Sequence, residues 1–307
     1  RAEFEGIEVS LDRGEKEIVR KIRTSRGELT GRWVLGPDGD WWQSEYPVKS
    51  ADDLDAASEY CRGKVHRLRE DVSWAAADAD PSSDILAIRL PQQPFSEIIH
   101  DLLGFDEGII ILMQEGERIA ELTELLESSH TELIHTLLPR IDKMGSEASA
   151  DAGEMVFYSP DNLDANFITP DHFDRYLRDG YERTLTRLHE AEYGLAVHVG
   201  GYVRPLLSRL GDVGIDILQG ISGPPQSDAP LAEARELTGP KPLLWGGIPQ
   251  DLVLPSADLQ VLEDTLGEVE ASCLEDGRMV AGISDKVPVE ADPERLAFIR
   301  NFFEKPR

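Results

Sequence analysis

Cysteine, lysine and long apolar runs are scarce in this 307-residue chain. Only two cysteines occur, Cys61 and Cys273, so a disulfide framework is excluded and a reducing, cytoplasmic location is expected. No run of about 18 apolar residues is present, which argues against a membrane-spanning helix. Lysine and arginine number 31 against 59 aspartates and glutamates, a formal net charge of −28. Such an acidic protein is a poor partner for nucleic acids or anionic lipids.

Glycine-rich phosphate-binding motifs are also missing. No G-x-G-x-x-G follows an apolar run, and no G-x-x-x-x-G-K-[ST] occurs anywhere. The dinucleotide-binding and nucleoside-triphosphate-binding versions of the open α/β sheet therefore lose support. Both cysteines fall on the apolar faces of predicted helices, and we expect buried thiols out of reach of any metal site.

Short apolar runs alternate with amphipathic segments along most of the chain. The runs predict strands at 84–90, 154–159, 194–199, 215–221, 242–248 and 278–284. Helical spacing appears between them in two rows, Ile119, Leu122, Leu126, Leu133, Leu137, Ile141 and Phe173, Tyr176, Leu177, Tyr181, Leu185, Leu188. Thr169-Pro170 and Asp292-Pro293 are typical of helix starts.

Strand followed by helix, repeated, predicts an α/β fold with a parallel sheet. We expect a closed TIM-type (β/α)8 barrel, because the motifs of the open alternatives are absent. The first 80 residues differ: they are rich in aromatic and turn residues, with a hairpin turned by Pro37-Asp38-Gly39 and a helix capped at Ser50. We therefore predict a single domain over 1–307, with an N-terminal excursion over 1–80 and a barrel body over 81–307.

Several strings occur in an order that resembles one known family. They are "EYPVKSADDLD", "YSPDNLDANFITPDHFDRY", "HVGGYVRPLLSRLGDVGIDILQGI", "DAPLAEARELTGPKPLLWGGIP" and "SDKVPVEADPERL". Together they resemble the uroporphyrinogen decarboxylase superfamily, and most closely its divergent methyltransferases that serve corrinoid proteins and coenzyme M. The resemblance implies a TIM-type barrel, with a first strand expected upstream of Arg1.

The chain also departs from that family. The "RQAGRY"-like segment whose arginines hold carboxylates in true uroporphyrinogen decarboxylases is absent, which disfavours uroporphyrinogen as the substrate. The family's zinc methyltransferases use an H-x-C pair and a later cysteine. Here His198 is retained, but Gly200 stands at the position of that cysteine, and the last-strand region supplies Asp285 without a cysteine. The thiolate zinc site is therefore not expected, although a divalent metal bound by harder ligands stays open.

Polar residues follow the predicted strands, where barrel enzymes place their chemistry. His198, Asp161 and Asp285 are the candidate catalytic residues, since a histidine and two carboxylates supply acid–base groups. Any metal would be held by His198 with Asp161 or Asp285. The candidate substrate-binding residues are Asn162, Gly200, Gly201, Gln219, Ser222, Trp245 and Lys286.

Three functions remain open on the sequence alone. The first is methyl transfer or demethylation between a small molecule and a corrinoid carried by a partner protein. The second is a decarboxylase or lyase-like activity, and the third is a binding barrel without catalysis. His198 is either a reactive rim residue or a packed structural histidine. His130 and His135 lie about 140° apart around their helix and do not share one face.

Overall fold

The computed structural model describes residues 2–68, 85–147 and 155–304. The chain divides into two compact units: unit 1 comprises residues 1–86 and 91–155, and unit 2 comprises residues 87–90 and 156–307. The first residues of two predicted strands, Asp84 and Glu154, lie outside the described residues. Compact units of this kind occur within one domain as well as between domains. The single domain predicted over 1–307 therefore stays a prediction.

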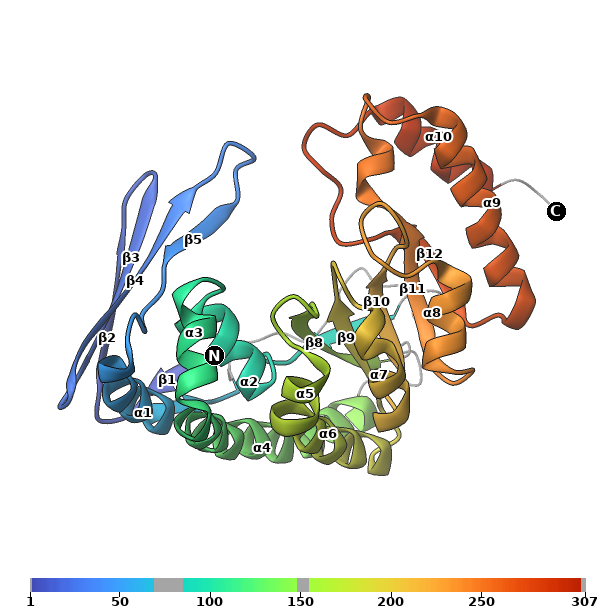
Figure 1. The fold of residues 1–307 in the computed structure, drawn as a ribbon. Coiled ribbons are helices and arrows are strands. Elements are labelled where there is room, and N and C mark those ends of the chain that lie inside the picture. The colour runs from blue at the N-terminus through green and yellow to red at the C-terminus, as the bar shows by residue number, and fades with distance from the viewer. Residues whose placement is uncertain (1, 69–84, 148–154, 305–307) are drawn as a thin grey trace. The chain divides into compact units, whose positions relative to one another are not determined.

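Unit 1 combines antiparallel strands with helices (Figure 1). One sheet has the order β2-β3-β4-β5, and β1 pairs separately with β6. The predicted hairpin around Pro37-Asp38-Gly39 is confirmed as β4–β5. The strands of unit 1 are β1 (Ala2–Phe4), β2 (Glu8–Arg13), β3 (Glu17–Thr24), β4 (Gly27–Leu35), β5 (Trp41–Glu45) and β6 (Lys64–His66). Its helices are α1 (Leu54–Gly63), α2 (Pro94–Glu97), a π-helical segment (Ile98–Leu103), α3 (Glu107–Gln114) and α4 (Gly116–Glu147).

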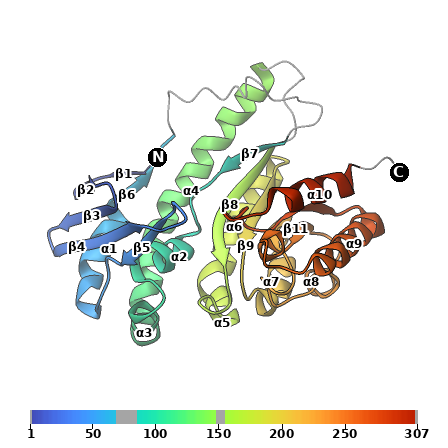
Figure 2. The ribbon, with the colours of Figure 1, turned by 90° about the horizontal axis from the view of Figure 1, so that it is seen from above.

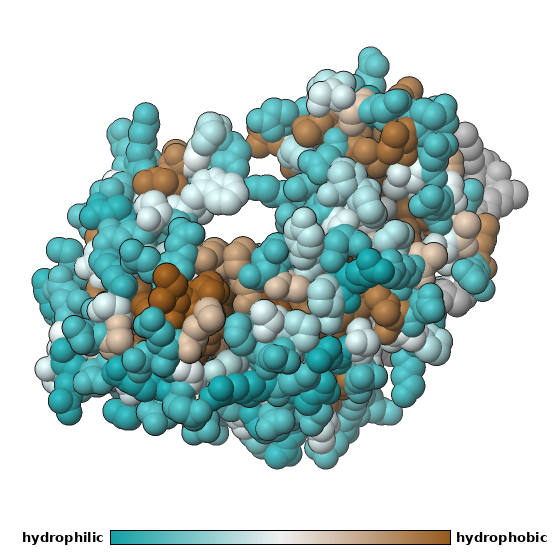
Figure 3. Space-filling view, in the orientation of Figure 1, coloured by the Kyte–Doolittle hydropathy of each residue, from teal (hydrophilic) through white to brown (hydrophobic). Residues whose placement is uncertain are grey.

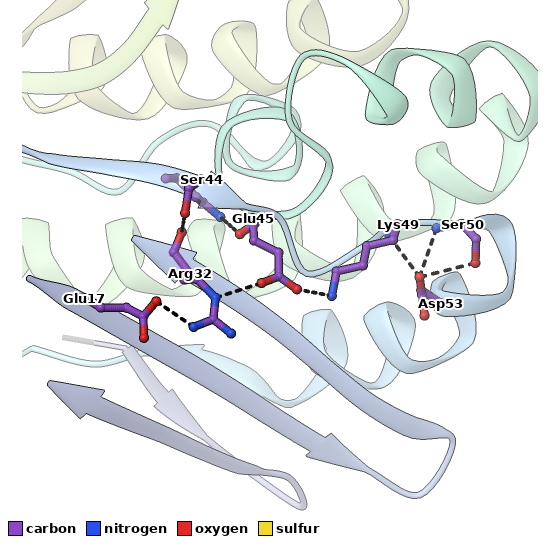
Figure 4. Close-up of polar contacts among 8 residues, drawn as sticks. Glu17, Arg32, Ser44, Glu45, Lys49, Ser50 and Asp53 are labelled. Atoms are coloured by element: carbon purple, nitrogen blue, oxygen red, sulfur yellow. Dashed lines mark hydrogen bonds and ion pairs between the residues drawn. The ribbon is translucent and has the colours of Figure 1, made fainter. Parts of the chain in front are cut away.

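Charged side chains join the strands of the unit 1 sheet to each other. Arg32 on β4 pairs with Glu17 on β3 at 2.7 Å and with Glu45 on β5 at 3.0 Å (Figure 4). Further along the chain, Ser50 and Asp53 form the capping box predicted from the sequence. These ion pairs are solvent-accessible, so each contributes at most about 1 kcal/mol to stability.

Three histidines of unit 1, His66, His130 and His135, differ in their burial and contacts. His130 on α4 is buried and His135 is exposed, which agrees with their predicted placement on different faces. His66 on β6 contacts Ser129, whose Oγ lies 3.0 Å from Nδ1 of His66. Burial, followed by the positive charge of Lys64, lowers the pKa of His66 to about 3. His66 therefore stays neutral in the folded protein at ordinary pH.

Unit 2 is built on a six-stranded sheet in the order β12-β11-β10-β9-β8-β7. The pairings from β8 through β12 are parallel. Each strand coincides with an apolar run predicted from the sequence. The strands are β7 (Leu86–Arg89), β8 (Met155–Leu163), β9 (Gly194–Val199), β10 (Ile217–Ile221), β11 (Leu243–Ile248) and β12 (Met279–Ile283).

The order of these strands corrects the predicted barrel. Neighbours in sequence are neighbours in the sheet, so successive connections step in one direction, as in a (β/α)8 barrel and unlike a doubly wound sheet. Among the described residues, however, the sheet has six strands and its edges, β7 and β12, do not pair. The fold is thus an open, curled half-barrel and not a closed eight-stranded barrel. Alternation of strand and helix identifies each repeating unit but does not reveal whether the first and last strands meet.

The helices of unit 2 begin where the sequence predicts. The Thr169 side chain accepts a hydrogen bond from the His172 N–H at 3.2 Å, and Asp292 accepts from the Glu294 N–H at 2.8 Å. Figure 2 shows α7, α8 and α9 along one side of the strands. The helices are α5 (Pro170–His172), a π-helical segment (Phe173–Leu177), α6 (Arg178–Glu190), α7 (Leu207–Val213), α8 (Leu231–Thr238), α9 (Leu259–Asp276) and α10 (Pro293–Phe303), with short 3-10 turns at Arg204–Leu206 and Gln250–Val253.

Hydrophilic residues cover much of the face drawn in Figure 3, in keeping with the net charge of −28. Within the described part of the chain, none of the helices combines the length and apolar character needed to cross a lipid bilayer.

The two cysteines, both predicted to be buried, differ in their exposure. Cys61 on α1 is buried, as predicted, whereas Cys273 on α9 is only half-buried.

Candidate functional site

A row of four side chains crosses the strands of unit 2. His198 on β9 pairs with Gln219 on β10, which also pairs with Trp245 on β11. Trp245 in turn pairs with Val280 on β12. Directly paired residues of a parallel sheet project from the same face. Trp245 is 37% exposed and Val280 is 39% exposed, so we call this face the open face.

The preceding row on the same strands projects from the opposite face. Its members, Val197, Leu218, Leu244 and Met279, are paired in the same way and are at most 9% exposed. Helix α9 packs against β11 and β12, and α6 packs against β9. We call this side the helix face. The period-2 alternation of a strand thus separates a core row from a row that includes His198 and Gln219.

His198 is held in place by Gln219. Nδ1 of His198 lies 2.5 Å from Oε1 of Gln219. Because an amide oxygen only accepts hydrogen bonds, Nδ1 carries the proton, and the lone pair of the neutral ring is on Nε2. The hydroxyl of Tyr158 on β8 lies 3.5 Å from the same oxygen, at the outer limit of hydrogen-bond distance. Gln219, predicted to bind substrate, is therefore engaged with His198.

Tyr158 is a site residue that the sequence reasoning missed. Burial raises the pKa of the Tyr158 hydroxyl, the charge of Arg89 on β7 lowers it, and the charges of Asp161 and Asp285 raise it further. Both predicted catalytic carboxylates therefore lie within electrostatic range of this phenol. Strand alternation contained a usable signal, since Tyr158 pairs with β9 on the open face.

Asp161 does not project from the open face. Asp161 is fully buried, as are Phe157 and Ser159 at the preceding alternate positions of β8. Its Oδ2 accepts a hydrogen bond of 2.5 Å from the hydroxyl of Tyr181 on α6. Burial, and then the charge of Asp161, raise the pKa of Tyr181 well above its ordinary value. Asp161 is thus part of the contact between β8 and a covering helix, and its catalytic role stays a prediction.

Two other predicted site residues have left-handed backbones. Asn162 near the end of β8 has φ of 49°, and Asp285 just after β12 has φ of 65°. Asparagine and aspartate tolerate this region better than other non-glycine residues, yet such positions still carry strain and cluster at functional sites. The residue before Asp285 is anchored to the neighbouring strand region, because Oγ of Ser284 donates a hydrogen bond to the Ile221 carbonyl at 2.8 Å.

The two predicted glycines after β9 play different parts. Gly201 has φ of 56°, and a Cβ there would collide with Oδ2 of Asp164. Gly201 is therefore needed for the turn itself. Gly200 lies outside the left-handed region, and a Cβ there would come 3.0 Å from Oδ1 of Asn162 and 4.0 Å from Nε2 of His198. The absence of a side chain at Gly200 leaves space next to Nε2 of His198.

The remaining predicted residues are less closely connected to His198. Ser222 is buried and its hydroxyl donates to the Gly223 carbonyl, so it faces inward. Lys286 is exposed. Trp245 shares the row of His198 and presents a partly exposed indole on the open face. The structure therefore places His198, Gln219 and Trp245 in one row on the open face, with Asn162 and Gly200 next to His198.

The donor set does not fit a thiolate zinc site. Such a site needs cysteine ligands, and position 200, next but one to His198, is a glycine and supplies no ligand atom. In the ranges that the structure describes, no group of three or more histidine, cysteine, aspartate or glutamate side chains is placed to hold a metal ion. A metal bound by His198 with Asp161 or Asp285 stays a prediction, and no chemical step below passes through it.

Comparisons with known proteins support the fold. No protein-family model and no curated protein matches the chain. Among solved structures, the chain is similar to a methyltransferase from Methanosarcina mazei, with a TM-score of 0.52 and 14% sequence identity over 89% of this chain and 75% of that chain. The chain therefore has a methyltransferase-like α/β fold. Membership of the uroporphyrinogen decarboxylase superfamily stays a prediction.

Proposed function

We propose that the protein is a methyl-transferring or demethylating enzyme that exchanges a methyl group between a small molecule and a corrinoid carried by a partner protein. The observation that carries the proposal is the open-face row, in which Gln219 fixes His198 with its Nε2 lone pair beside the space at Gly200. The methyltransferase-like fold supports the same reaction class. A fold alone does not define an activity, so His198 is the residue on which the proposed reaction depends.

The chemistry that this geometry supports is proton transfer at Nε2 of His198. In the direction of methylation, the electron pair of a substrate S, O or N atom forms the new bond to the methyl group. The cobalt of the corrinoid, as a substrate, keeps the electron pair of the broken cobalt–carbon bond. The substrate proton passes to Nε2, and the resulting imidazolium keeps its Nδ1–H bond to Gln219. In the direction of demethylation, the imidazolium returns this proton to the leaving atom.

A methylcobalamin titration on purified variants tests the proposal. The wild-type protein should change the cobalamin absorption spectrum, and His198→Ala should lose this response while its melting temperature stays within a few degrees. His189→Ala is a matched control, because His189 pairs with exposed Asp216 at the other end of the strands and takes no part in the open-face row. It should retain the full response.

The alternatives predict other results. A decarboxylase or lyase gives no cobalamin response but releases product from a carboxylate substrate. A binding protein without catalysis gives neither signal. If His198→Ala instead lowers stability by about 1 to 3 kcal/mol and retains the cobalamin response, His198 is a packed structural residue and the proposal is wrong.

A further inference from the structure

The space beside Gly200 is bordered by two polar atoms. A Cβ at this position would have Oδ1 of Asn162 at 3.0 Å and Nε2 of His198 at 4.0 Å. Apart from its chain neighbours, no third atom of the described residues lies within 4 Å of that point. The point therefore marks a small opening toward which two side chains from neighbouring strands converge.

Both bordering atoms are hydrogen-bond acceptors. Oδ1 of Asn162 is a carbonyl oxygen, and in the neutral imidazole whose Nδ1 donates to Gln219 the lone pair of His198 is on Nε2. Two acceptors that face one point favour a group that brings hydrogen atoms to it. While Nε2 of His198 is unprotonated, a carboxylate or an ether oxygen would meet lone pairs on both sides and would be disfavoured; in the direction of demethylation, Nε2 carries a proton and donates to the methylated atom instead.

We propose that the opening at Gly200 is the head-group subsite of the small-molecule substrate, and that it takes a proton-donating thiol, hydroxyl or amine. Gln219 is a positioning residue for this subsite, since its oxygen keeps the proton of the neutral ring on Nδ1 and leaves Nε2 free to accept. The proposal specifies the head group of the substrate for the proposed methyl transfer. It rests on that function only for the claim that the bound thiol, hydroxyl or amine is then methylated. Binding itself requires no methyl transfer.

The rest of the substrate has an apolar surface to lie on. Trp245 and Val280 continue the row of His198, and both are more than a third exposed. Trp245 is two strands away from His198, which corresponds to roughly 10 Å at the usual strand spacing. A head group attached to a small apolar or aromatic body therefore matches the open face better than a highly charged molecule.

A comparison of Gly200 with a glycine elsewhere in unit 2 makes the subsite testable. Gly200 lies outside the left-handed region, so the backbone tolerates alanine, whose methyl group would occupy the opening and displace the Asn162 oxygen by a few tenths of an ångström. Gly267 on α9 is a matched control: it also lies outside the left-handed region, and a Cβ there meets nothing within 4 Å. Gly200→Ala should block the head group, whereas Gly267→Ala should leave it unaffected.

The experiment uses NMR of the full chain labelled with 13C and 15N in histidine, with His198 assigned through His198→Gln. Phenol and anisole are the probes, because they share a ring and an oxygen substituent, which carries a hydrogen in phenol and a methyl group in anisole. We expect the neutral Nδ1–H form of His198, a shift of its ring signals by phenol, and little shift by anisole. In Gly200→Ala the phenol affinity should fall about tenfold or more, while Gly267→Ala should behave as wild type.

Several outcomes overturn the proposal. They are a neutral His198 with its proton on Nε2, equal responses to phenol and anisole, or an undiminished phenol response in Gly200→Ala. Should Gly200→Ala not fold, Asn162→Gly replaces it, because glycine accepts the left-handed backbone while removing the bordering oxygen. An undiminished phenol response in that variant also overturns the proposal. A protein that passes the test without a methylcobalamin response retains the subsite and loses only the proposed methyl transfer.

Discussion

Replacing Tyr181 with phenylalanine tests whether Asp161 is structural. The Tyr181 hydroxyl donates to Oδ2 of Asp161 at 2.5 Å, and both residues are fully buried. Phenylalanine keeps the ring and removes only the donor, so the carboxylate loses a partner that water does not replace. A hydrogen bond to a charged group contributes about 1.5 to 3 kcal/mol. For a unit of this size that corresponds to a fall in melting temperature of roughly 3 to 12 °C.

Thermal and urea unfolding of Tyr181→Phe, Asp161→Asn and the double variant measures this contribution directly. The double-mutant cycle should give a coupling energy of about 1 to 3 kcal/mol between the two side chains. Tyr176→Phe is the matched control, since Tyr176 lies one turn earlier and is only half-buried. Its stability should change by no more than about 0.5 kcal/mol. If Tyr181→Phe unfolds like wild type yet loses cobalamin response, Asp161 and Tyr181 take part in the chemistry and the structural reading is wrong.

The three remaining predictions concern His66, Asp285 and the two cysteines. The pKa of His66 is lowered from 6.5 to about 3 in the folded protein. As pH falls from 6.5 to 3, the unfolded chain therefore binds the proton first, and the free energy of unfolding falls by at most about 1.4 kcal/mol per pH unit. Urea melts of His66→Gln should show a weaker decline, and an identical decline would refute this. Asp285→Gly should be about 1 kcal/mol more stable than Asp285→Ala in thermal melts, because alanine is strained at φ of 65°; equal stabilities would contradict the left-handed conformation. Native iodoacetamide labelling followed by mass spectrometry should modify half-buried Cys273 before Cys61, whose pKa is raised by burial; faster labelling of Cys61 would show that α1 opens.

Most of the strands of unit 2 were predictable because the apolar character of a covered strand is a local property of the sequence. Residues such as Val197 and Leu218 lie on strands covered by helices, and covered parallel strands appear in the sequence as apolar runs. The helix starts at Thr169 and Asp292 were predictable for the same reason, since a cap needs only residues that follow within a few positions.

The site was predicted only in part, because its geometry depends on pairing between strands. His198 and Gln219 were both selected from the sequence, but their contact follows from the register of β9 and β10. Asp161 was expected beyond the end of a strand that in fact continues to Leu163, and this extension turns its side chain toward α6. Tyr158 was overlooked since it lies within an apolar run.

The residues of the open-face row belong to strands and not to the connecting loops. His198, Gln219 and Trp245 keep their mutual spacing through backbone hydrogen bonds between β9, β10 and β11, at about 4.8 Å per strand. The loops that follow these strands can therefore change in length and sequence while the spacing of the row stays constant. For protein engineering, this means that loops can be grafted onto an unaltered sheet, so that the surroundings of the imidazole–amide pair change while the pair itself is kept.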